Sequence, residues 1–315
     1  MECKKCGRPA VYVDRRSGTA LCEEHFREGL EDRVRKEIRG EGIGKDKRHI
    51  RIAMGISGGK DSLVMMDLLW RVEREYDVEL IALTVDEGIE GGEYRRRRFD
   101  LIRRMAQERG IKWELRSFKQ KYGFTLDEAV VALKGKEEPC SICGVLRRRA
   151  LNDYAKELGA DYLAIAHNLD DEAETVLMNV IRGDSQALRR SENYSEELAA
   201  FYVPRIKPMR RITEREAAFY AYLMGIPAEE EECPYARLSL RDEVRSFLDT
   251  LVRDHPAARD SLVRLGDELK DKGKGFSRAR CANCGYPTSG GRKYCRVCEI
   301  NFAVKGTLIG ANQES

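Results

Sequence analysis

The sequence predicts an α/β fold with a parallel sheet, helices on both of its faces, and a small zinc module at each end of the chain. From residue 49 onward, short apolar segments alternate with helical segments of roughly 10 to 20 residues. Such alternation is typical of parallel sheets covered by crossover helices. Cys-x2-Cys pairs, a spacing that supplies metal ligands two at a time, stand near the two ends. Ligands of such sheets bind at the carboxyl ends of the strands, near a topological switch point.

Each expected element follows from its local pattern: apolar runs bounded by polar or turn residues predict strands, and amphipathic periodicity predicts helices. A charged helix, Phe26–Ile38, precedes a glycine-rich linker at Gly40, Gly42 and Gly44. The expected strands are Ile50–Ile56, Glu79–Val85, Lys112–Phe118, Asp161–Ala166 and a short one, Phe201–Ile206, before Pro208. The expected helices of the α/β region are Ser62–Glu75, Tyr94–Arg109, Thr125–Leu133, Val145–Leu158 and Glu172–Ile181. After Thr213 the chain is expected to be helical over Glu214–Met224, Leu240–Val252 and Ala257–Asp271.

These patterns divide the chain into five expected regions. They are an N-terminal zinc finger over 1–30, a linker helix over 31–48, an ATP-binding α/β domain over 49–235, a helical extension over 236–275, and a C-terminal zinc ribbon and tail over 276–315. The only internal resemblance that we find is between the two metal modules. We have no interpretation of the Ser-rich and charged stretch Asp184–Tyr202.

Composition sets further expectations. The net charge of +3 requires no nucleic-acid partner by itself. With 35% charged residues, four Gln and seven Asn, the chain has a thermophile-type composition. No signal peptide opens the chain and no apolar run reaches the length of a membrane span, so a cytoplasmic protein is expected. In such a reducing compartment thiols are more often metal ligands than disulfides.

The cysteines near the ends fall into two ligand quartets. Cys3, Cys6, Cys22 and His25 fit one zinc ion, and Cys281, Cys284, Cys295 and Cys298 fit a second. Two roles stay open for these modules. Each metal can simply hold together a segment too small for its own core. Alternatively, the modules clamp a nucleic acid, with basic side chains that contact its phosphates at Arg278, Arg280, Arg292, Lys293 and Arg296.

A phosphate-binding loop follows the first expected strand of the sheet. The apolar run Ile52–Ile56 leads into Ser57–Ser62 (SGGKDS), and Leu63–Met66 then begins an apolar helical face. This strand, glycine turn and helix N-terminus surround an anion with backbone N–H groups, while Lys60 adds a positive charge. The loop differs from a Walker A motif in its spacing, and Asp61 stands where Walker A has a hydroxyl residue. A carboxylate there is placed to hold Mg²⁺ against a pyrophosphate.

Three cysteines lie outside the two quartets. Cys140 and Cys143 form a Cys-x2-Cys pair before the basic stretch Arg147–Arg149, and Cys233 follows some 90 residues later. The spacing allows a redox pair that passes sulfur as persulfide or disulfide. It also allows a [4Fe–4S] cluster with three thiolate ligands and one open iron, or a structural zinc.

The motifs resemble those of a known superfamily. Ser57–Ser62 is similar to the signature of the PP-loop ATP pyrophosphatases, which have an adenine nucleotide alpha hydrolase-like fold. His167–Thr175 (HNLDDEAET) resembles a motif of the tRNA 2-thiolation branch, and Pro208–Arg210 resembles a weaker third motif. Together with the two metal modules, the resemblance to the two-zinc-finger class of tRNA-uridine 2-sulfurtransferases spans the whole chain.

This resemblance implies the site residues. ATP contacts are implied at Ala53, Met54, Gly55, Ser57, Gly58, Gly59, Lys60, Asp61, Ser62, Asp86, Arg147, Ala166, His167 and Asp171. Catalytic roles are implied for Lys60, Asp61, Arg147 and Asp171, and Cys140, Cys143 and Cys233 would hold the iron–sulfur cluster. The implied cofactors are ATP, Mg²⁺, two Zn²⁺ and one [4Fe–4S] cluster.

The resemblance also implies a reaction and partners. The uridine O2 would attack the α-phosphate of ATP, and sulfur would then replace the adenylated oxygen. The thermophile-type composition favours 5-methyluridine of the tRNA T-loop as target, with the wobble uridine as the alternative. A thiocarboxylated ubiquitin-like sulfur carrier and a homodimer are expected, with no membrane association. A non-catalytic zinc-ribbon RNA-binding protein is the second alternative, although it would not need Lys60, Asp61, Asp170 and Asp171.

Overall fold

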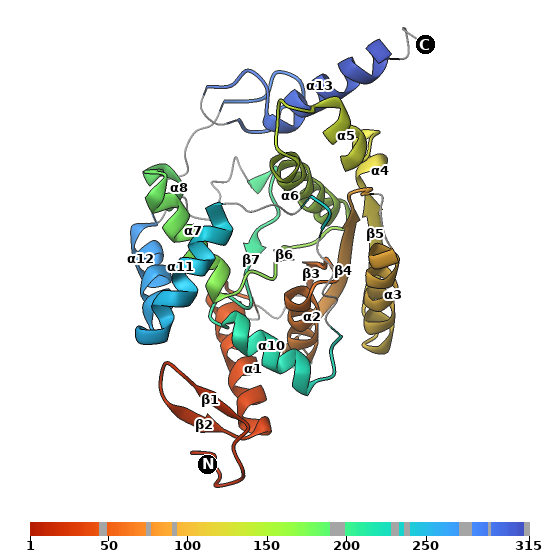
Figure 1. Cartoon of the computed structure of the whole chain (residues 1–315). Coiled ribbons are helices and arrows are strands. Elements are labelled where there is room, and N and C mark those ends of the chain that lie inside the picture. The colour runs from red at the N-terminus through yellow and green to blue at the C-terminus, as the bar shows by residue number, and fades with distance from the viewer. Residues whose placement is uncertain are drawn as a thin grey trace.

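The computed structural model describes residues 1–43, 49–73, 77–89, 93–189, 199–227, 233–235, 240–270, 279–288 and 291–311 (Figure 1). Gly44 and Arg278 lie outside these residues. The strands are β1 (Tyr12–Asp14), β2 (Thr19–Leu21), β3 (Ile50–Gly55), β4 (Val78–Asp86), β5 (Lys112–Ser117), β6 (Tyr162–Ala164) and β7 (Arg205–Ile206). The first helices are α1 (Glu23–Gly40), α2 (Lys60–Glu73), α3 (Glu93–Glu108), α4 (Phe118–Tyr122), α5 (Leu126–Ala132) and α6 (Pro139–Glu157). They are followed by α7 (Leu169–Ile181), α8 (Ser185–Arg189), α10 (Glu214–Leu223), α11 (Leu240–Asp254), α12 (Ala258–Leu269) and α13 (Arg296–Ala311).

The predicted parallel sheet is confirmed. Its five strands lie in the order β5-β4-β3-β6-β7, and every neighbouring pair is parallel. Strand β3, the first of the sheet in sequence, lies at its centre. The chain builds outward through β4 and β5 and then returns to place β6 on the other side of β3, where Met54 pairs with Ala164. This reversal puts the switch point between β3 and β6, where such sheets bind their ligands.

Helices cover both faces of the sheet, as predicted. On β3, Ile52 and Met54 point into a core shared with α1, α2, α3 and α10. Ala53 points the other way, into a core shared with α4, α5, α6 and α13. The alternation follows from the two-residue period of a strand, and burial on both faces explains why β3 is apolar from Ile52 to Met54. A third apolar cluster joins α7, α11 and α12 beside the sheet.

Side-chain caps fix where several helices begin. Ser117, Thr125, Asn168 and Thr213 each form a capping box with the residue three positions later. The cap at Asn168 starts α7 at Leu169, earlier than the predicted Glu172. Helix α6 also begins earlier than predicted, since Pro139 occupies its first turn.

The last predicted strand is shorter than expected. Only Arg205–Ile206 of Phe201–Ile206 pairs with the sheet. The side chain of Asn152, on α6, forms hydrogen bonds with the backbone that precedes this strand. Its amide donates to the Phe201 carbonyl at 2.8 Å and its oxygen accepts from Val203 N at 3.0 Å. Those groups are therefore satisfied by a helix side chain in place of a neighbouring strand.

The C-terminal helix α13 was not expected from the sequence. It carries Val297, Ile300 and Val304 at a spacing of three and four residues, and this stripe packs against the α5 and α6 side of the core. This periodic apolar stripe was the sequence signal from which the helix could have been predicted. In Figure 1, α13 lies at the end of the molecule opposite to β1 and β2, so the two terminal modules are far apart.

The N-terminal module is tied to the central domain by helix α1, which runs without a break across the expected boundary at residue 30. Tyr12 packs its ring 4.6 Å from Phe26 and 5.3 Å from Phe219 of α10, measured between ring centroids. Beside these rings lies the buried carboxylate of Glu216.

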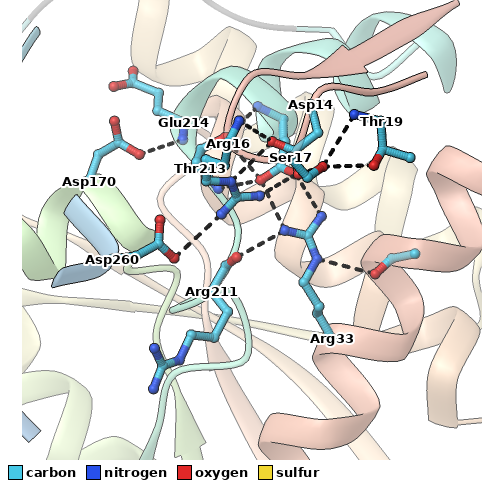
Figure 2. A network of polar contacts seen from close by, with 12 residues as sticks. Asp14, Arg16, Ser17, Thr19, Arg33, Asp170, Arg211, Thr213, Glu214 and Asp260 are labelled. Atoms are coloured by element: carbon cyan, nitrogen blue, oxygen red, sulfur yellow. Dashed lines mark hydrogen bonds and ion pairs between the residues drawn. The ribbon is translucent and has the colours of Figure 1, made fainter. Parts of the chain in front are cut away.

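Glu216 is the centre of a polar network, and its partners Arg16, Arg33 and Thr213 are labelled in Figure 2. Its oxygens accept from Arg33 Nη2 at 2.7 Å and from Arg16 Nη2 at 3.0 Å, and one caps the N-terminus of α10 through Thr213 N at 2.8 Å. Burial alone would raise the pKa of Glu216, but these cations and the cap hold it below its usual range. The network joins the zinc module, α1 and α10 at one carboxylate.

None of the helices in the described part of the chain combines the length and apolarity needed to cross a bilayer.

We expect Glu216→Gln to lower the free energy of unfolding at pH 7 by about 3 kcal/mol, because it leaves two partly buried guanidinium groups without their shared carboxylate. The lowered pKa means that this contribution exists above the pKa of an unfolded glutamate and disappears as the pH falls through the folded value. The loss should therefore shrink in acid. Chemical denaturation at several pH values measures both effects.

Glu108→Gln is the matched control, since Glu108 is 61% exposed and pairs only at 3.5 Å with Arg109. It should change stability by less than about 0.5 kcal/mol. Equal effects of the two substitutions would contradict the role of Glu216.

Candidate active site

The phosphate loop has the predicted form of a strand, a glycine turn and a helix N-terminus. Strand β3 ends at Gly55 and α2 begins at Lys60. Ser62 holds the loop closed by donating its hydroxyl to the Gly59 carbonyl at 2.8 Å and accepting from Ser57 N at 3.3 Å. Because Ser62 turns back to its own loop, it is a structural residue of the turn, and the N–H groups at the start of α2 remain available for an anion.

Gly58 is required by the geometry of the loop. Its φ of +82° is in the left-handed region, and a Cβ added there would lie 2.9 Å from the Cβ of Arg98 on α3. Both backbone conformation and space therefore exclude a side chain. This residue lets the loop pass close under α3.

Lys60 and Asp61 stand side by side at the start of α2. Lys60 Nζ lies 3.3 Å from Glu214 Oε1 and 3.8 Å from Asp61 Oδ1. Asp61 Oδ1 is buried and accepts no hydrogen bond from any described residue. Burial raises the pKa of Asp61 to about 6, Glu214 and Asp171 add to the rise, and Lys60 opposes it. A carboxylate with one buried, unsatisfied oxygen beside a phosphate loop fits a bound Mg²⁺, which prefers oxygen ligands.

A cavity of about 400 Å³ opens at the carboxyl ends of β3 and β6. It brings together much of the predicted site, namely Gly55, Ser57, Gly59, Lys60, Asp61, Ser62, Cys143, Arg147, Ala166, His167 and Cys233. The phosphate loop and two cysteines of the central trio thus face one space. This cavity lies at the switch point, where the sequence predicted that the ligand binds.

Other predicted residues do not line this cavity. Ala53 and Met54 are fully buried in the two cores, so only their backbone is near the nucleotide site. Gly58 lies behind the loop, against Arg98. Asp86 accepts from Gly88 N at 2.9 Å, a short-range bond that shapes the turn after β4.

The two aspartates of the second motif accept hydrogen bonds from backbone N–H groups at the N-terminal ends of helices. Asp170 accepts from Glu214 N at 2.8 Å, at the start of α10, and lies 3.0 Å from Arg259 Nε. Asp171 accepts from Asn168 N at 3.2 Å and lies 3.5 Å from Arg241 Nη1. Asp171 is near enough to Asp61 to raise its pKa, yet its oxygens cap α7 and do not line the cavity.

The cavity also contains residues that sequence reasoning missed. They include Thr84, Val85 and Glu87 at the end of β4, Arg98 and Phe99 on α3, and Ile165 after β6. Glu87 Oε1 lies 3.6 Å from Arg147 Nη1, which orients the arginine across the cavity. Glu87 could have been predicted, because it is a polar residue directly after a buried strand. Arg98 could not, because its place in the cavity depends on how α3 packs over the loop.

The central cysteines gather around the N-terminal end of α6. Cys140 and Cys143 are one helical turn apart, so they share a face of the helix. Cys143 and Cys233 line the nucleotide cavity, while Cys140 Sγ lies 3.4 Å from the carbonyl of Tyr235, two residues after Cys233. Two of these thiols line the cavity and the third lies on the same turn of α6, and three thiols are the donor set of a cluster with an open iron.

Each terminal quartet brings its ligand atoms within 4.8 Å of one another. Sγ of Cys6 lies 3.7 Å from Sγ of Cys22, and Sγ of Cys284 lies 3.7 Å from Sγ of Cys295. A tetrahedral zinc with bonds near 2.3 Å separates its sulfurs by about 3.8 Å, so both quartets have the size of a zinc site.

Backbone donors prepare one thiol in each quartet for a cation. Burial opposes ionisation of Cys3, but N–H groups that include that of Cys22 outweigh it and lower its pKa to about 6. The same balance, with Cys295 N donating at 3.2 Å, lowers the pKa of Cys281 to about 6. A thiolate is the form that binds zinc.

Comparison with known proteins agrees with this site. The profile of the PP-loop domain matches residues 30–248, and that of the N-terminal LIM domain of the 2-thiouridine synthetase TtuA matches residues 2–27. The tRNA 2-thiolation protein NcsA of Haloferax volcanii is 36% identical over 95% of this chain and 98% of its own. The chain belongs to the PP-loop tRNA 2-thiolation family.

Two further members of this family are similar over nearly the whole chain. The cytoplasmic tRNA 2-thiolation protein 1 of Drosophila sechellia is 35% identical over 95% of this chain and 87% of its own. The U34-tRNA thiolase NcsA of Methanococcus maripaludis, solved with its [4Fe–4S] cluster, superposes with a TM-score of 0.81 at 37% identity, covering 96% of this chain and 95% of that one. The predicted resemblance to PP-loop tRNA thiolases is therefore confirmed, and tRNA 2-thiolation is the activity of the family.

We expect Gly58→Ala to weaken ATP binding by about 10-fold or more, because the new Cβ must move Arg98 or the loop itself. Isothermal titration with ATP and Mg²⁺ measures the effect. Gly110→Ala is the control: φ is +66° there, but nothing lies within 4 Å of an added Cβ. It should cost about 1 kcal/mol of stability and leave ATP affinity unchanged; weakened ATP binding in this control would disprove the steric explanation.

If each quartet binds one zinc, Cys22→Ala should lower the zinc content from two per chain to one, because three ligands hold zinc far less tightly than four. Elemental analysis of the purified chain measures the loss. Cys22→His supplies a nitrogen ligand in place of the thiolate and should retain more metal. Full zinc content in Cys22→Ala would show that the quartet is not a zinc site.

Proposed function

We propose that this protein is an ATP-dependent sulfurtransferase that replaces the C2 oxygen of the tRNA wobble uridine with sulfur. The observation that carries the proposal is the single cavity shared by Lys60, Asp61, Cys143 and Cys233. Activation of an oxygen by ATP and delivery of sulfur can then occur at one place.

The wobble position is favoured by the comparisons. The Methanococcus maripaludis relative is described as a U34-tRNA thiolase, and it covers nearly this whole chain. The T-loop 5-methyluridine, which the thermophile-type composition favoured, receives no support from the relatives described above. The alternative target named from the sequence therefore becomes the proposed one.

The first step follows from the loop. Backbone N–H groups at the start of α2 and the ammonium group of Lys60 bind the phosphates of ATP, and Lys60 exchanges its contact with Glu214 for phosphate oxygens. Asp61 would hold Mg²⁺, which supplies neutralisation of the charge on the leaving pyrophosphate. The uridine O2 attacks the α-phosphorus, the bond to the β-phosphate oxygen breaks, and an O2-adenylated uridine and pyrophosphate form.

In the second step a hydrosulfide adds to C2 of the activated uridine and AMP leaves with the original oxygen. Arg147, oriented by Glu87, lies on the wall between the cysteines and the loop and can neutralise the departing AMP. Cys140, Cys143 and Cys233 would hold the [4Fe–4S] cluster, whose open iron supplies a site for the sulfur. A thiocarboxylated sulfur-carrier protein is the proposed donor, and the cytoplasm, named in the Drosophila relative, is the proposed location.

The test is thiolation of a defined tRNA. The anaerobically purified protein is incubated with an unmodified tRNA transcript, ATP, Mg²⁺ and sulfide, and the RNA is digested and analysed by nucleoside mass spectrometry. We expect 2-thiouridine in a transcript with uridine at position 34 and none when that base is cytidine. Sulfur found instead at the T-loop would refute the wobble assignment, and absence of any thiolated nucleoside would refute the activity.

We expect Asp61→Asn to slow tRNA-dependent exchange of pyrophosphate into ATP by about 100-fold or more, because the carboxylate beside the phosphates is lost. Binding of tRNA itself should not change. Asp100→Asn, at a carboxylate that is 68% exposed on α3, is the control and should exchange at the normal rate. Exchange preserved in Asp61→Asn would remove this residue from the mechanism.

A further inference from the structure

A second and larger cavity lies beside the nucleotide site. It measures about 540 Å³ and is enclosed by α6, α7, α12, strand β7 and the C-terminal zinc module. Eight of the described residues that line it are Arg or Lys, against two carboxylates, Glu172 and Asp267. Such an excess of positive charge in a hollow attracts an anion.

Most of these cations are already neutralised. Six of the eight contact a carboxylate; for example, Lys207 Nζ lies 3.0 Å from Glu172 and Arg210 Nη2 lies 2.6 Å from Asp267. Arg148 and Arg205 differ, because neither contacts a carboxylate among the residues that the structure describes. Partial burial holds the pKa of Arg148 below its usual range, and the neighbouring cations Arg205 and Arg147 lower it further. Two neighbouring guanidinium groups that line one cavity, with no carboxylate partner among the described residues, can bind an external anion.

The two arginines lie next to the reaction site. On α6, Arg147 lines the nucleotide cavity and Arg148, the next residue, lines the second cavity. The other shared wall is the pair His167 and Glu172, whose Nδ1 and Oε1 atoms are 3.5 Å apart: the histidine faces the nucleotide and the carboxylate faces the second cavity. An anion held by Arg148 and Arg205 is therefore separated from the nucleotide by one layer of side chains.

Two aromatic rings, those of Tyr202 and Tyr286, line the same cavity, and one of them stacks on the neighbouring Arg149. Tyr286, from the C-terminal zinc module, lies 3.3 Å below the guanidinium of Arg149 and meets Tyr202 edge-on at 5.1 Å between centroids. Arginines interleaved with aromatic rings are typical of grooves that bind single-stranded nucleic acid, whose phosphates and bases they contact together. An acidic protein segment would need the positive charge but would make less use of the rings.

We propose that Arg148 and Arg205 form a binding site for a backbone phosphate of the RNA substrate, next to the nucleotide that reacts. The proposal rests on the proposed tRNA function and names a positioning site for it. Guanidinium forks match the oxygens of a phosphate, so the site fixes the register of the RNA while the adjacent base enters the nucleotide cavity. The C-terminal zinc module then has a definite task, since Tyr286 closes this site.

The experiment compares two double variants of the full-length, metal-loaded protein. Arg148→Gln with Arg205→Gln removes the site; Arg104→Gln with Arg253→Gln removes the same charge from two exposed positions on α3 and α11 that line neither cavity. The dissociation constant of the tRNA transcript is measured across salt concentrations. We expect the first pair to weaken binding about 10-fold and to reduce the slope of log K against log salt by about 1, while the control changes affinity less than about twofold.

Further arms identify the source of the phosphate. Inorganic pyrophosphate, added at concentrations that saturate the nucleotide site, should not abolish the difference in tRNA affinity between the two double variants. Their affinities for ATP should be equal. Equal tRNA affinity and salt slope in the two double variants would overturn the proposal. So would a selective loss of binding to pyrophosphate, or to a thiocarboxylated carrier protein, with tRNA binding intact.

Failure of this inference can be told from failure of the proposed function. If the unaltered protein thiolates tRNA but the Arg148 and Arg205 variant binds it normally, only the phosphate site is wrong. If the unaltered protein neither binds nor thiolates tRNA, the function itself fails. Should the double variant not fold, as judged by circular dichroism and zinc content, the single substitution Arg205→Gln replaces it, with an expected threefold or greater loss of affinity.

Discussion

The left-handed turn at Gly58 is the constraint on which the active site depends. It lets the chain leave the centre of the sheet and enter α2 directly, so that the helix N-terminus, Lys60 and Asp61 all face the gap between β3 and β6. Ser62 then closes the turn through the Gly59 carbonyl. Because α3 packs against Gly58 from outside, the loop is held between this helix on one side and the Ser62 side chain on the other.

Helix α6 organises the chemistry around this loop. Its first turn carries Cys140 and Cys143, the next turn presents Arg147 to the nucleotide cavity and Arg148 to the second cavity, and Asn152 fixes the backbone that leads into β7. One rigid element therefore places thiols, a phosphate-facing cation and the edge of the sheet relative to each other. Such placement on a helix is more exact than placement on loops.

The two terminal modules are attached differently although their ligand sets are alike. The N-terminal module is bonded through Glu216 to α1 and α10. At the start of α10, the backbone N–H of Glu214 donates to Asp170 (Figure 2), and the Glu214 carboxylate contacts Lys60. The C-terminal module instead lies over α6 and contributes Tyr286 to the second cavity. One module supports the domain behind the phosphate loop, and the other borders the surface proposed for RNA.

The sequence by itself determined the sheet, the phosphate loop and both ligand quartets, because these depend on local spacing: an apolar run before glycines, or paired ligands with two residues between them. Tertiary structure decided the rest. It turned Asp171 into a helix cap, shortened the last strand through Asn152, and brought Glu87 and Arg98 into the cavity. It also placed Arg148 and Arg205 in the lining of the second cavity without a carboxylate partner among the described residues, while the other six cations there form ion pairs. Pairing of charges depends on distances between segments far apart in the chain, which no local pattern encodes.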